Sequence, residues 1–268
     1  MNIGTAVPTT TELSVIKHHF VQHKSIKHPY TVGDFEREAI AKLDTIFEQN
    51  NIAILVGGSG LYADAILSGL DKFPDIDPQI RVELQNQLQQ NGITYLVNEF
   101  QKLDPIYYQK ILSTNPQTLQ NPHRIMRFLE VCVGTNLPYS SFLKTENPIR
   151  NFVPILIALD ANREVMYNRI NQRVDSMMHQ GLLQEANKLY PFKNLNALQT
   201  VGYKELFQHI EQQITLAEAV EEIKKNTRRF AKRQLTWFKR YQIVKWFDFQ
   251  EDINKIITFI NNNQNQKS

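Results

Sequence analysis

The hydrophobic pattern centres on one apolar run that ends at a glycine-rich turn. The run is Ile52–Val56, and apolar positions at helical spacing follow the turn from Leu61 to Leu67. A short run rich in Ile and Val is typical of a strand buried on both faces of a parallel sheet. We therefore expect strand, tight turn and helix here. The helix N-terminus, with its unpaired N–H groups, would suit a phosphate.

The glycine turn alone does not specify a ligand. Gly57, Gly58 and Gly60 match neither the GxxxxGK[ST] phosphate loop nor the GxGxxG dinucleotide pattern. A turn that only reverses the chain is the alternative, and the turn by itself leaves both interpretations open.

The remaining pattern alternates helices and strands, which indicates an α/β fold. Asp34 is a candidate cap for a helix that runs to Gln49, and the basic helix beginning at Glu218 is expected to be the longest. The other predicted elements are a strand at Phe152–Leu159, a helix after it, the basic helix Glu218–Tyr241, a strand at Gln242–Phe247, a helix at Glu251–Asn261 and a disordered tail at 262–268.

Residues 77–145 lack any strand pattern. Three Asp-Pro or Asn-Pro pairs, which begin at Asp77, Asp104 and Asn121, each provide an N-cap followed by proline at the first helical position. We expect four regions: the first part of an α/β core (1–76), an all-helical insertion (77–145), the second part of the core with the basic helix (146–261), and the tail (262–268).

Composition narrows the class of protein only modestly. The chain has 268 residues, 42% hydrophobic residues and a net charge of +3, so charge as a whole does not indicate nucleic-acid binding. The single cysteine, Cys132, fits a reducing compartment, and we expect a cytoplasmic monomer with no membrane partner. Four histidines (His18, His19, His23 and His28) lack the spacing of a metal site and are expected to lie in a polar loop.

The strongest chemical signal is a basic helix. Eight cations occur between Lys224 and Arg240 with no acidic residue among them, while Ile223, Phe230, Trp237 and Tyr241 form an apolar stripe. We expect the stripe to dock on the core and the cations to contact phosphate or an RNA backbone. A solvated surface helix is the alternative, although such helices usually intersperse acids.

Two shorter motifs add candidates. In His123–Arg127, Arg124 and Arg127 share a helical face that could bind phosphate or stack on bases, while Ile125 packs inward. In Val201–Glu205, Lys204 at the start of a helix could place its ammonium at a phosphate. An ordinary amphipathic helix and an exposed turn lysine are the respective alternatives.

Taken together and in order, these stretches resemble the tRNA dimethylallyltransferase family, also called tRNA isopentenyltransferases. The resemblance covers nearly the whole chain, and nine stretches carry it: Ile3–Pro8 (IGTAVP), His18-His19, Tyr30–Phe35 (YTVGDF), Leu55–Tyr62 (LVGGSGLY), Asp77–Arg81 (DPQIR), Asn121–Val131 (NPHRIMRFLEV), Gly181–Glu185 (GLLQE), Val201–Glu205 (VGYKE) and Thr227–Phe238 (TRRFAKRQLTWF).

The resemblance implies a fold, a reaction and a set of contacts. The fold would be a parallel sheet like that of P-loop kinases, with a helical insertion that grips the anticodon arm. The reaction would transfer a dimethylallyl group from dimethylallyl diphosphate to N6 of adenosine 37, in tRNAs that read codons beginning with U, with Mg²⁺ assisting the leaving diphosphate. Lys204 would lie near the diphosphate. The implied tRNA contacts are Ser59, Arg81, His123, Arg124, Ile125, Met126, Arg127, Arg228, Arg229, Lys232 and Arg233.

The sequence departs from the family at its start. Members carry a first strand, a GxxxxGK[ST] loop and a catalytic Asp before the IGTA motif, whereas this sequence begins at that motif and contributes no catalytic residue that we can assign. We hypothesise that Met1 is an internal methionine of a longer protein or that the sequence is a fragment. The rival hypothesis is a catalytically dead, truncated tRNA-binding protein, and a third is a small-molecule kinase of related fold.

Overall fold

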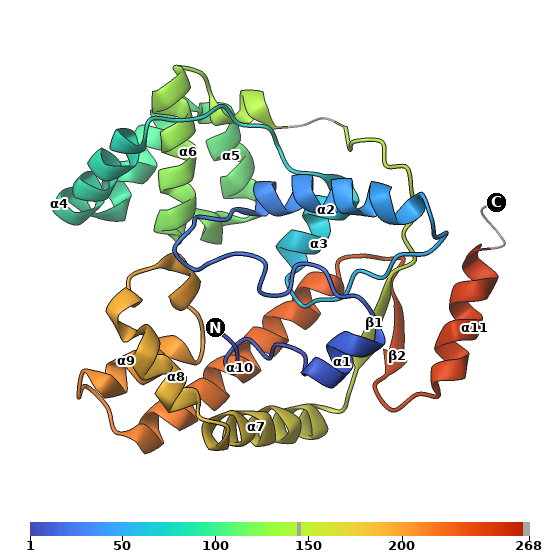
Figure 1. The fold of residues 1–268 in the computed structure, drawn as a ribbon. Coiled ribbons are helices and arrows are strands. Elements are labelled where there is room, and N and C mark those ends of the chain that lie inside the picture. Colours follow the sequence, from blue (N-terminus) through green and yellow to red (C-terminus); the bar gives the residue numbers. More distant parts are fainter. Residues whose placement is uncertain (144–145, 265–268) are drawn as a thin grey trace. The chain divides into compact units, whose positions relative to one another are not determined.

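The computed structural model describes residues 1–143 and 146–264, and the chain divides into two compact units (Figure 1). The first unit combines residues 1–67 with the chain from Asn151 onward, and the second is Ser68–Arg150. The sequence predicted a helical insertion at residues 77–145, and the described part of this stretch, 77–143, belongs to the second unit. None of the helices in the described residues combines the length and apolarity needed to cross a membrane.

The first unit is mostly helical and carries a small sheet. Its α-helices and strands are α1 (Thr10–Val15), α2 (Val32–Phe47), α3 (Gly60–Ser68, whose last residue is the first of the second unit), β1 (Ile157–Asp160), α7 (Arg163–His179), α8 (Leu182–Leu189), α9 (Tyr203–Ile210), α10 (Leu216–Phe238), β2 (Lys245–Asp248) and α11 (Ile253–Gln264); two 3₁₀ turns, η3 (Tyr190–Phe192) and η4 (Asn196–Leu198), join α8 to α9.

Strands β1 and β2 pair in parallel, with Ile157 opposite Lys245 and Asp160 opposite Asp248. Each strand overlaps the C-terminal end of a predicted strand, but it begins later, ends one residue beyond the prediction and is shorter. The parallel pairing agrees with the expected α/β class. Among the described residues the sheet has these two strands only, so the wide kinase-like sheet is not seen in this chain.

The predicted strand at Ile52–Val56 is wrong. These residues are in no helix or strand, and Ile54 and Val56 are 83% and 87% exposed. A strand needs a neighbour that satisfies its N–H and C=O groups, and the described residues offer none here. The apolar pattern therefore indicates a β preference, but no strand among the described residues pairs with this segment.

Several helix boundaries also differ from the prediction. Thr31, not Asp34, is the N-cap of α2: Asp34 is the third helical residue and closes a capping box with Thr31. Helix α10 has 23 residues and ends at Phe238 rather than Tyr241. Helix α4 spans 26 residues but is interrupted at the non-helical Gly92, so α10 is the longest uninterrupted helix of the described residues, as predicted. Helix α11 includes residues 262–264 of the predicted disordered tail, and residues 265–268 lie outside the described residues.

The second unit is built of helices, as predicted. It contains α4 (Pro78–Leu103), α5 (Pro105–Thr114), η1 (Pro116–Gln120), α6 (Pro122–Thr135) and η2 (Tyr139–Phe142). Asp77, Asp104 and Asn121 cap α4, α5 and α6 through their side chains, each followed by proline, which confirms the three predicted helix starts.

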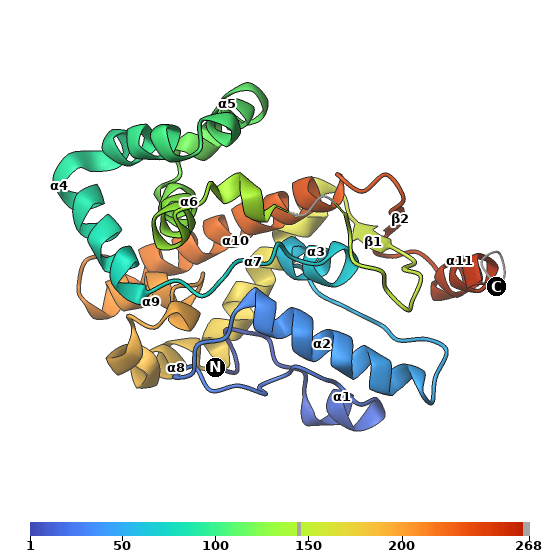
Figure 2. The same cartoon turned by 90° about the horizontal axis from the view of Figure 1, so that it is seen from above.

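Helix α4 bends sharply at Gly92, as Figure 2 shows. Gly92 has φ 73° and ψ 177°, a conformation that only glycine adopts readily. Beyond the bend, Leu96 and Phe100 pack against Ile125 and Leu129 of α6, and all four are essentially buried. This core fixes the two helices that carry the unit's candidate RNA contacts.

Candidate functional site

The Gly-rich turn of the first unit packs against the basic helix α10. A Cβ atom on Gly58 would overlap the Gln234 side chain, and one on Gly60 would overlap the Trp237 ring. Ser59 is exposed between them, and its carbonyl oxygen accepts the N–H groups of Tyr62 and Ala63 at 3.1 Å. The glycines thus allow close approach of two segments that the sequence pattern did not connect.

We expect alanine substitutions in this turn to form a graded series. Gly60→Ala should lower the free energy of unfolding by about 3 kcal/mol, because the rigid, half-buried indole of Trp237 cannot move aside cheaply. Gly58→Ala should cost less, because the amide end of Gln234 is flexible. Gly57→Ala is the matched control, since nothing lies within 4 Å of its added Cβ. Chemical denaturation measures all three, and equal costs would contradict the packing described.

A carboxylate clamp joins three of the matched motifs. Glu185 accepts the backbone N–H groups of Asn2 and Ile3 at 3.0 Å and of Gly4 at 3.2 Å, and it also accepts the hydroxyl of Tyr203. Tyr203 is fully buried, and a Cβ on Gly4 would lie 2.6 Å from its hydroxyl. The clamp therefore fixes the IGTA segment against α8 and α9.

These hydrogen bonds, together with burial, determine the ionisation states of Glu185 and Tyr203. Burial alone raises the pKa of Glu185, but the hydroxyl of Tyr203 and the three backbone N–H groups outweigh it and leave the pKa below its ordinary value. The pKa of Tyr203 is raised well above its usual range by burial and by its bond to Glu185. At neutral pH the clamp thus pairs a carboxylate with a neutral phenol.

Lys204 is exposed between two buried neighbours, Tyr203 and Glu205. Gly202, at φ 102°, turns the chain into α9, and its N–H donates to Glu205 Oε2 at 2.8 Å. The amide of Asn226 in α10 donates to Glu205 Oε1 at 2.8 Å. The position of Lys204 is therefore fixed relative to both the IGTA segment and the basic helix.

The N-terminal half of the basic cluster is largely paired, which corrects the prediction of an unpaired positive face. Lys224 bonds Asp175 of α7 at 2.9 Å and Glu221 at 3.1 Å, and the bond to Asp175 is the main reason that its pKa is raised. Lys225 bonds Glu222 at 2.7 Å. Glu221 and Glu222 precede the basic stretch, and Asp175 lies on another helix. The absence of acidic residues within 224–240 therefore did not indicate that the lysines were unpaired.

The cations of α10 that were predicted to contact RNA differ in their surroundings. Arg228 is half-buried and donates to Asn171 Oδ1 at 2.7 Å, and the exposed Arg229 donates to Asn226 Oδ1 at 3.2 Å. Lys232 and Arg233 are exposed. These two, together with Arg229, are the members best placed to meet an RNA backbone.

The predicted docking stripe of α10 is only partly correct. Ile223 is buried and Trp237 packs on the Gly60 turn, but Phe230 is 44% exposed and lies under the Arg233 guanidinium, 5.6 Å from its ring centroid. The guanidinium of Arg240 likewise lies over the Trp237 ring, 4.0 Å from its centroid. Arg240 also forms an ion pair with Asp64 of α3, with an N–O distance of 3.0 Å. Phe230 therefore extends the outer surface, where arginine and aromatic groups together suit unpaired bases.

In the second unit, the His123–Arg127 segment splits into an outer and an inner face. His123 and Arg124 are exposed, and Arg124 donates to Thr118 Oγ1 at 3.1 Å. Ile125 and Met126 are 0% and 3% exposed, so their side chains cannot touch RNA, contrary to the expectation from the resemblance. They anchor the helix in the core.

Arg81 and Arg127 meet at one carboxylate that sequence reasoning missed. Glu130 is buried, and its side chain bonds Arg81 at 2.6 Å and Arg127 at 3.3 Å. Its helical position three residues after Arg127 was readable from the sequence, but its pairing with α4 depends on the tertiary fold.

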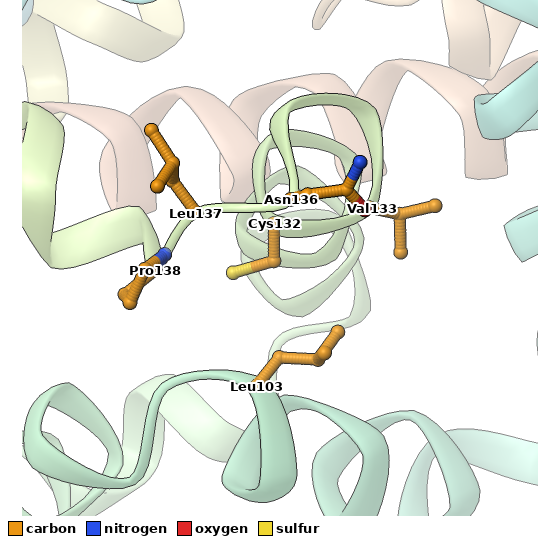
Figure 3. Close-up of a pocket in the computed structure, with 6 residues that line it drawn as sticks. All are labelled: Leu103, Cys132, Val133, Asn136, Leu137 and Pro138. Atoms are coloured by element: carbon orange, nitrogen blue, oxygen red, sulfur yellow. The ribbon is translucent and has the colours of Figure 1, made fainter.

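The second unit also has a shallow hollow of about 250 Å³ (Figure 3). Leu103, Cys132, Val133, Asn136, Leu137 and Pro138 line it. Burial raises the pKa of the Cys132 thiol, so this sulfur is not a ready nucleophile. Because these lining residues include no cation, we do not assign the diphosphate to this hollow.

Binding of Mg²⁺ by the protein alone would need several ligating side chains close together. Within residues 1–143 and 146–264, no three His, Cys, Asp or Glu side chains gather as a metal cage would require. We therefore assign no step to a metal ion held by protein side chains alone.

Comparison with known proteins identifies the class. The family model for IPP transferases matches residues 1–241. A tRNA dimethylallyltransferase of Flavobacterium psychrophilum is 63% identical over 97% of this chain and 85% of its own length, and one of Flavobacterium johnsoniae is 61% identical over 97% and 84%. The chain belongs to the IPP transferase family, and its activity class is that of a tRNA dimethylallyltransferase.

Solved structures agree with this assignment. The full-length tRNA isopentenylpyrophosphate transferase from Bacillus halodurans is 34% identical with a TM-score of 0.67, covering 100% of this chain and 83% of that one. A eukaryotic dimethylallyltransferase acting on tRNA, at 22% identity and a TM-score of 0.77, covers 99% and 70% and shows a similar fold.

Proposed function

We propose that the protein transfers the dimethylallyl group of dimethylallyl diphosphate to N6 of adenosine 37 in tRNAs that read codons beginning with U. The observation that carries the proposal is the clamp of Glu185 and Tyr203, which holds the IGTA segment beside the exposed Lys204. One exposed cation on a rigid support suits a diphosphate, whose negative charge grows as the C–O bond breaks.

The RNA contacts of the proposal come from both units. Arg229, Lys232 and Arg233 on α10 and Arg81, Arg124 and Arg127 on the second unit are at least partly exposed cations, which can bind phosphates. Ser59 is exposed at the Gly-rich turn beside α10. The second unit is proposed to bind the anticodon arm, and Mg²⁺ is proposed to arrive with the diphosphate, since Mg²⁺ is commonly held by substrate phosphates.

The salt dependence of RNA binding should identify the α10 contacts. A Lys232→Gln/Arg233→Gln double variant should weaken anticodon-arm binding. It should also make the negative slope of log K against log salt less steep by about 2, about 1 per lost phosphate contact. Lys255→Gln on α11 is the control for loss of a positive charge outside α10, because it removes one charge from a residue paired with Glu251. Titrations at several salt concentrations measure the slope, and an unchanged slope would remove α10 from the RNA surface.

Nucleoside analysis in cells tests the proposal itself. The chain is expressed in bacteria that lack their own transferase, and their tRNA is digested and analysed by mass spectrometry. N6-dimethylallyladenosine at position 37 is the expected result. Unmodified tRNA that nevertheless co-purifies with the chain would favour the alternative of an RNA-binding protein without catalysis.

A further inference from the structure

We infer that Glu130 is a positioning residue that holds Arg81 and Arg127 as a preorganised pair for RNA, an inference that rests on the proposed tRNA-binding function. Glu130 lies in α6, and its side chain is only 6% exposed. Arg81 comes from α4, forty-nine residues earlier, and bonds Oε1 at 2.6 Å. Arg127 bonds Oε2 at 3.3 Å. Each oxygen therefore orients a different guanidinium.

Each arginine keeps part of its guanidinium for an outside partner. The side chains of Arg81 and Arg127 are 49% and 41% exposed, and each uses one Nη atom on Glu130. A guanidinium carries five N–H donors, so several remain on each for phosphate or base edges. The guanidinium of Arg127 also lies 5.1 Å from the ring centroid of Phe73, which further limits its motion.

The support beneath the pair is rigid. Helices α4 and α6 lie side by side (Figure 1). On the Arg81 side of the Gly92 bend, Leu84 and Leu88 pack against the buried core that contains Leu129 of α6. Glu130 directly follows Leu129 in α6 and is itself buried. An arginine that is already held in place loses little conformational entropy when RNA binds, which strengthens binding without adding a contact.

The direction in which Glu130→Gln changes RNA affinity distinguishes a positioning role from a simple charge effect. Glu130→Gln removes a negative charge, so electrostatics alone would make the unit more attractive to RNA and tighten binding. Positioning predicts the opposite: two loosened arginines should weaken binding about tenfold, because ordering each long side chain again costs free energy. Glu99→Gln is the matched control, since it removes the same charge from a partly exposed pair with Lys102 in α4.

The experiment measures the affinity of the full chain for an RNA hairpin of the anticodon arm, with thermal unfolding of each variant alongside. We expect weaker binding for Glu130→Gln, equal or tighter binding for Glu99→Gln, and a smaller effect of Glu130→Gln when Arg81→Gln is already present. In transfer assays, KM for the hairpin should rise while kcat is retained. Equal or tighter binding by Glu130→Gln overturns the inference alone, whereas no binding by the parent chain overturns the proposed function and this inference with it.

If Glu130→Gln proves too unstable to assay, Arg81→Lys replaces it. Lysine keeps the charge and an ion pair but lacks the planar fork of donors. A severalfold loss of affinity supports the arginine pair, and full affinity overturns it.

Discussion

Glu185→Ala is expected to lower the free energy of unfolding by about 3 kcal/mol, because hydrogen bonds to a charged group are each worth more than neutral ones and several are lost together. The N–H groups of Asn2, Ile3 and Gly4 would lose their shared acceptor, and the buried hydroxyl of Tyr203 would lose its partner. Chemical denaturation measures the loss. Hydrogen exchange should show that the amides of residues 2–4 lose protection first.

Two variants serve as controls for this result. Glu185→Gln keeps an acceptor oxygen and should cost less than alanine, while Gln184→Ala changes an exposed neighbour on the same helix and should be nearly neutral. An alanine variant at Glu185 as stable as the parent would show that the clamp does not hold the IGTA segment.

The clamp also predicts a pH dependence with a definite sign. The pKa of Glu185 is lowered in the folded state, so the carboxylate stabilises the fold above its ordinary pKa of 4.5, and that contribution is lost as pH falls toward the folded-state value. Glu185→Gln should therefore flatten the fall in stability below pH 4.5. An identical acid profile for parent and variant would contradict this assignment.

Lys204→Ala is expected to lower kcat by about 10²-fold, the usual cost of removing one group that stabilises developing charge. The diphosphate gains negative charge as the C–O bond breaks, so the ammonium acts more strongly in the transition state than in the ground state. Steady-state kinetics with varied dimethylallyl diphosphate separates kcat from KM for the donor. RNA binding should change little, because Lys204 is assigned to the donor.

Lys204→Arg should retain most of kcat because it keeps the positive charge. Lys188→Ala, at an exposed lysine of α8, should leave kcat unchanged. A Lys204→Ala variant with the parent kcat would remove this residue from the diphosphate site. A loss of RNA affinity with unchanged kcat would instead place it on the RNA surface.

Local signals in the sequence predicted the helical unit well. Asp77, Asp104 and Asn121 each precede a proline, and this pairing defines helix starts through short-range bonds that need no tertiary partner. The inward packing of Ile125 was likewise readable from helical spacing. The family could also be recognised, because its motifs keep their order along the chain.

Features that depend on a distant partner could not be read in the same way. Ile52–Val56 has strand composition, but a strand forms only when a neighbouring strand completes its hydrogen bonds. Lys224 belongs to an acid-free stretch, yet Asp175, on another helix, pairs with it. The convergence of Arg81 and Arg127 on Glu130 similarly depends on how α4 packs against α6.

The most direct test of the account is transfer in solution with a mapped product. The chain is incubated with labelled dimethylallyl diphosphate, Mg²⁺ and an anticodon-arm hairpin, and the modified nucleoside is located by mass spectrometry. The account predicts label on N6 of adenosine 37 and none on a hairpin with guanosine at that position. A hairpin that binds the chain in a salt-dependent manner but never acquires the label would contradict transfer and leave an RNA-binding protein.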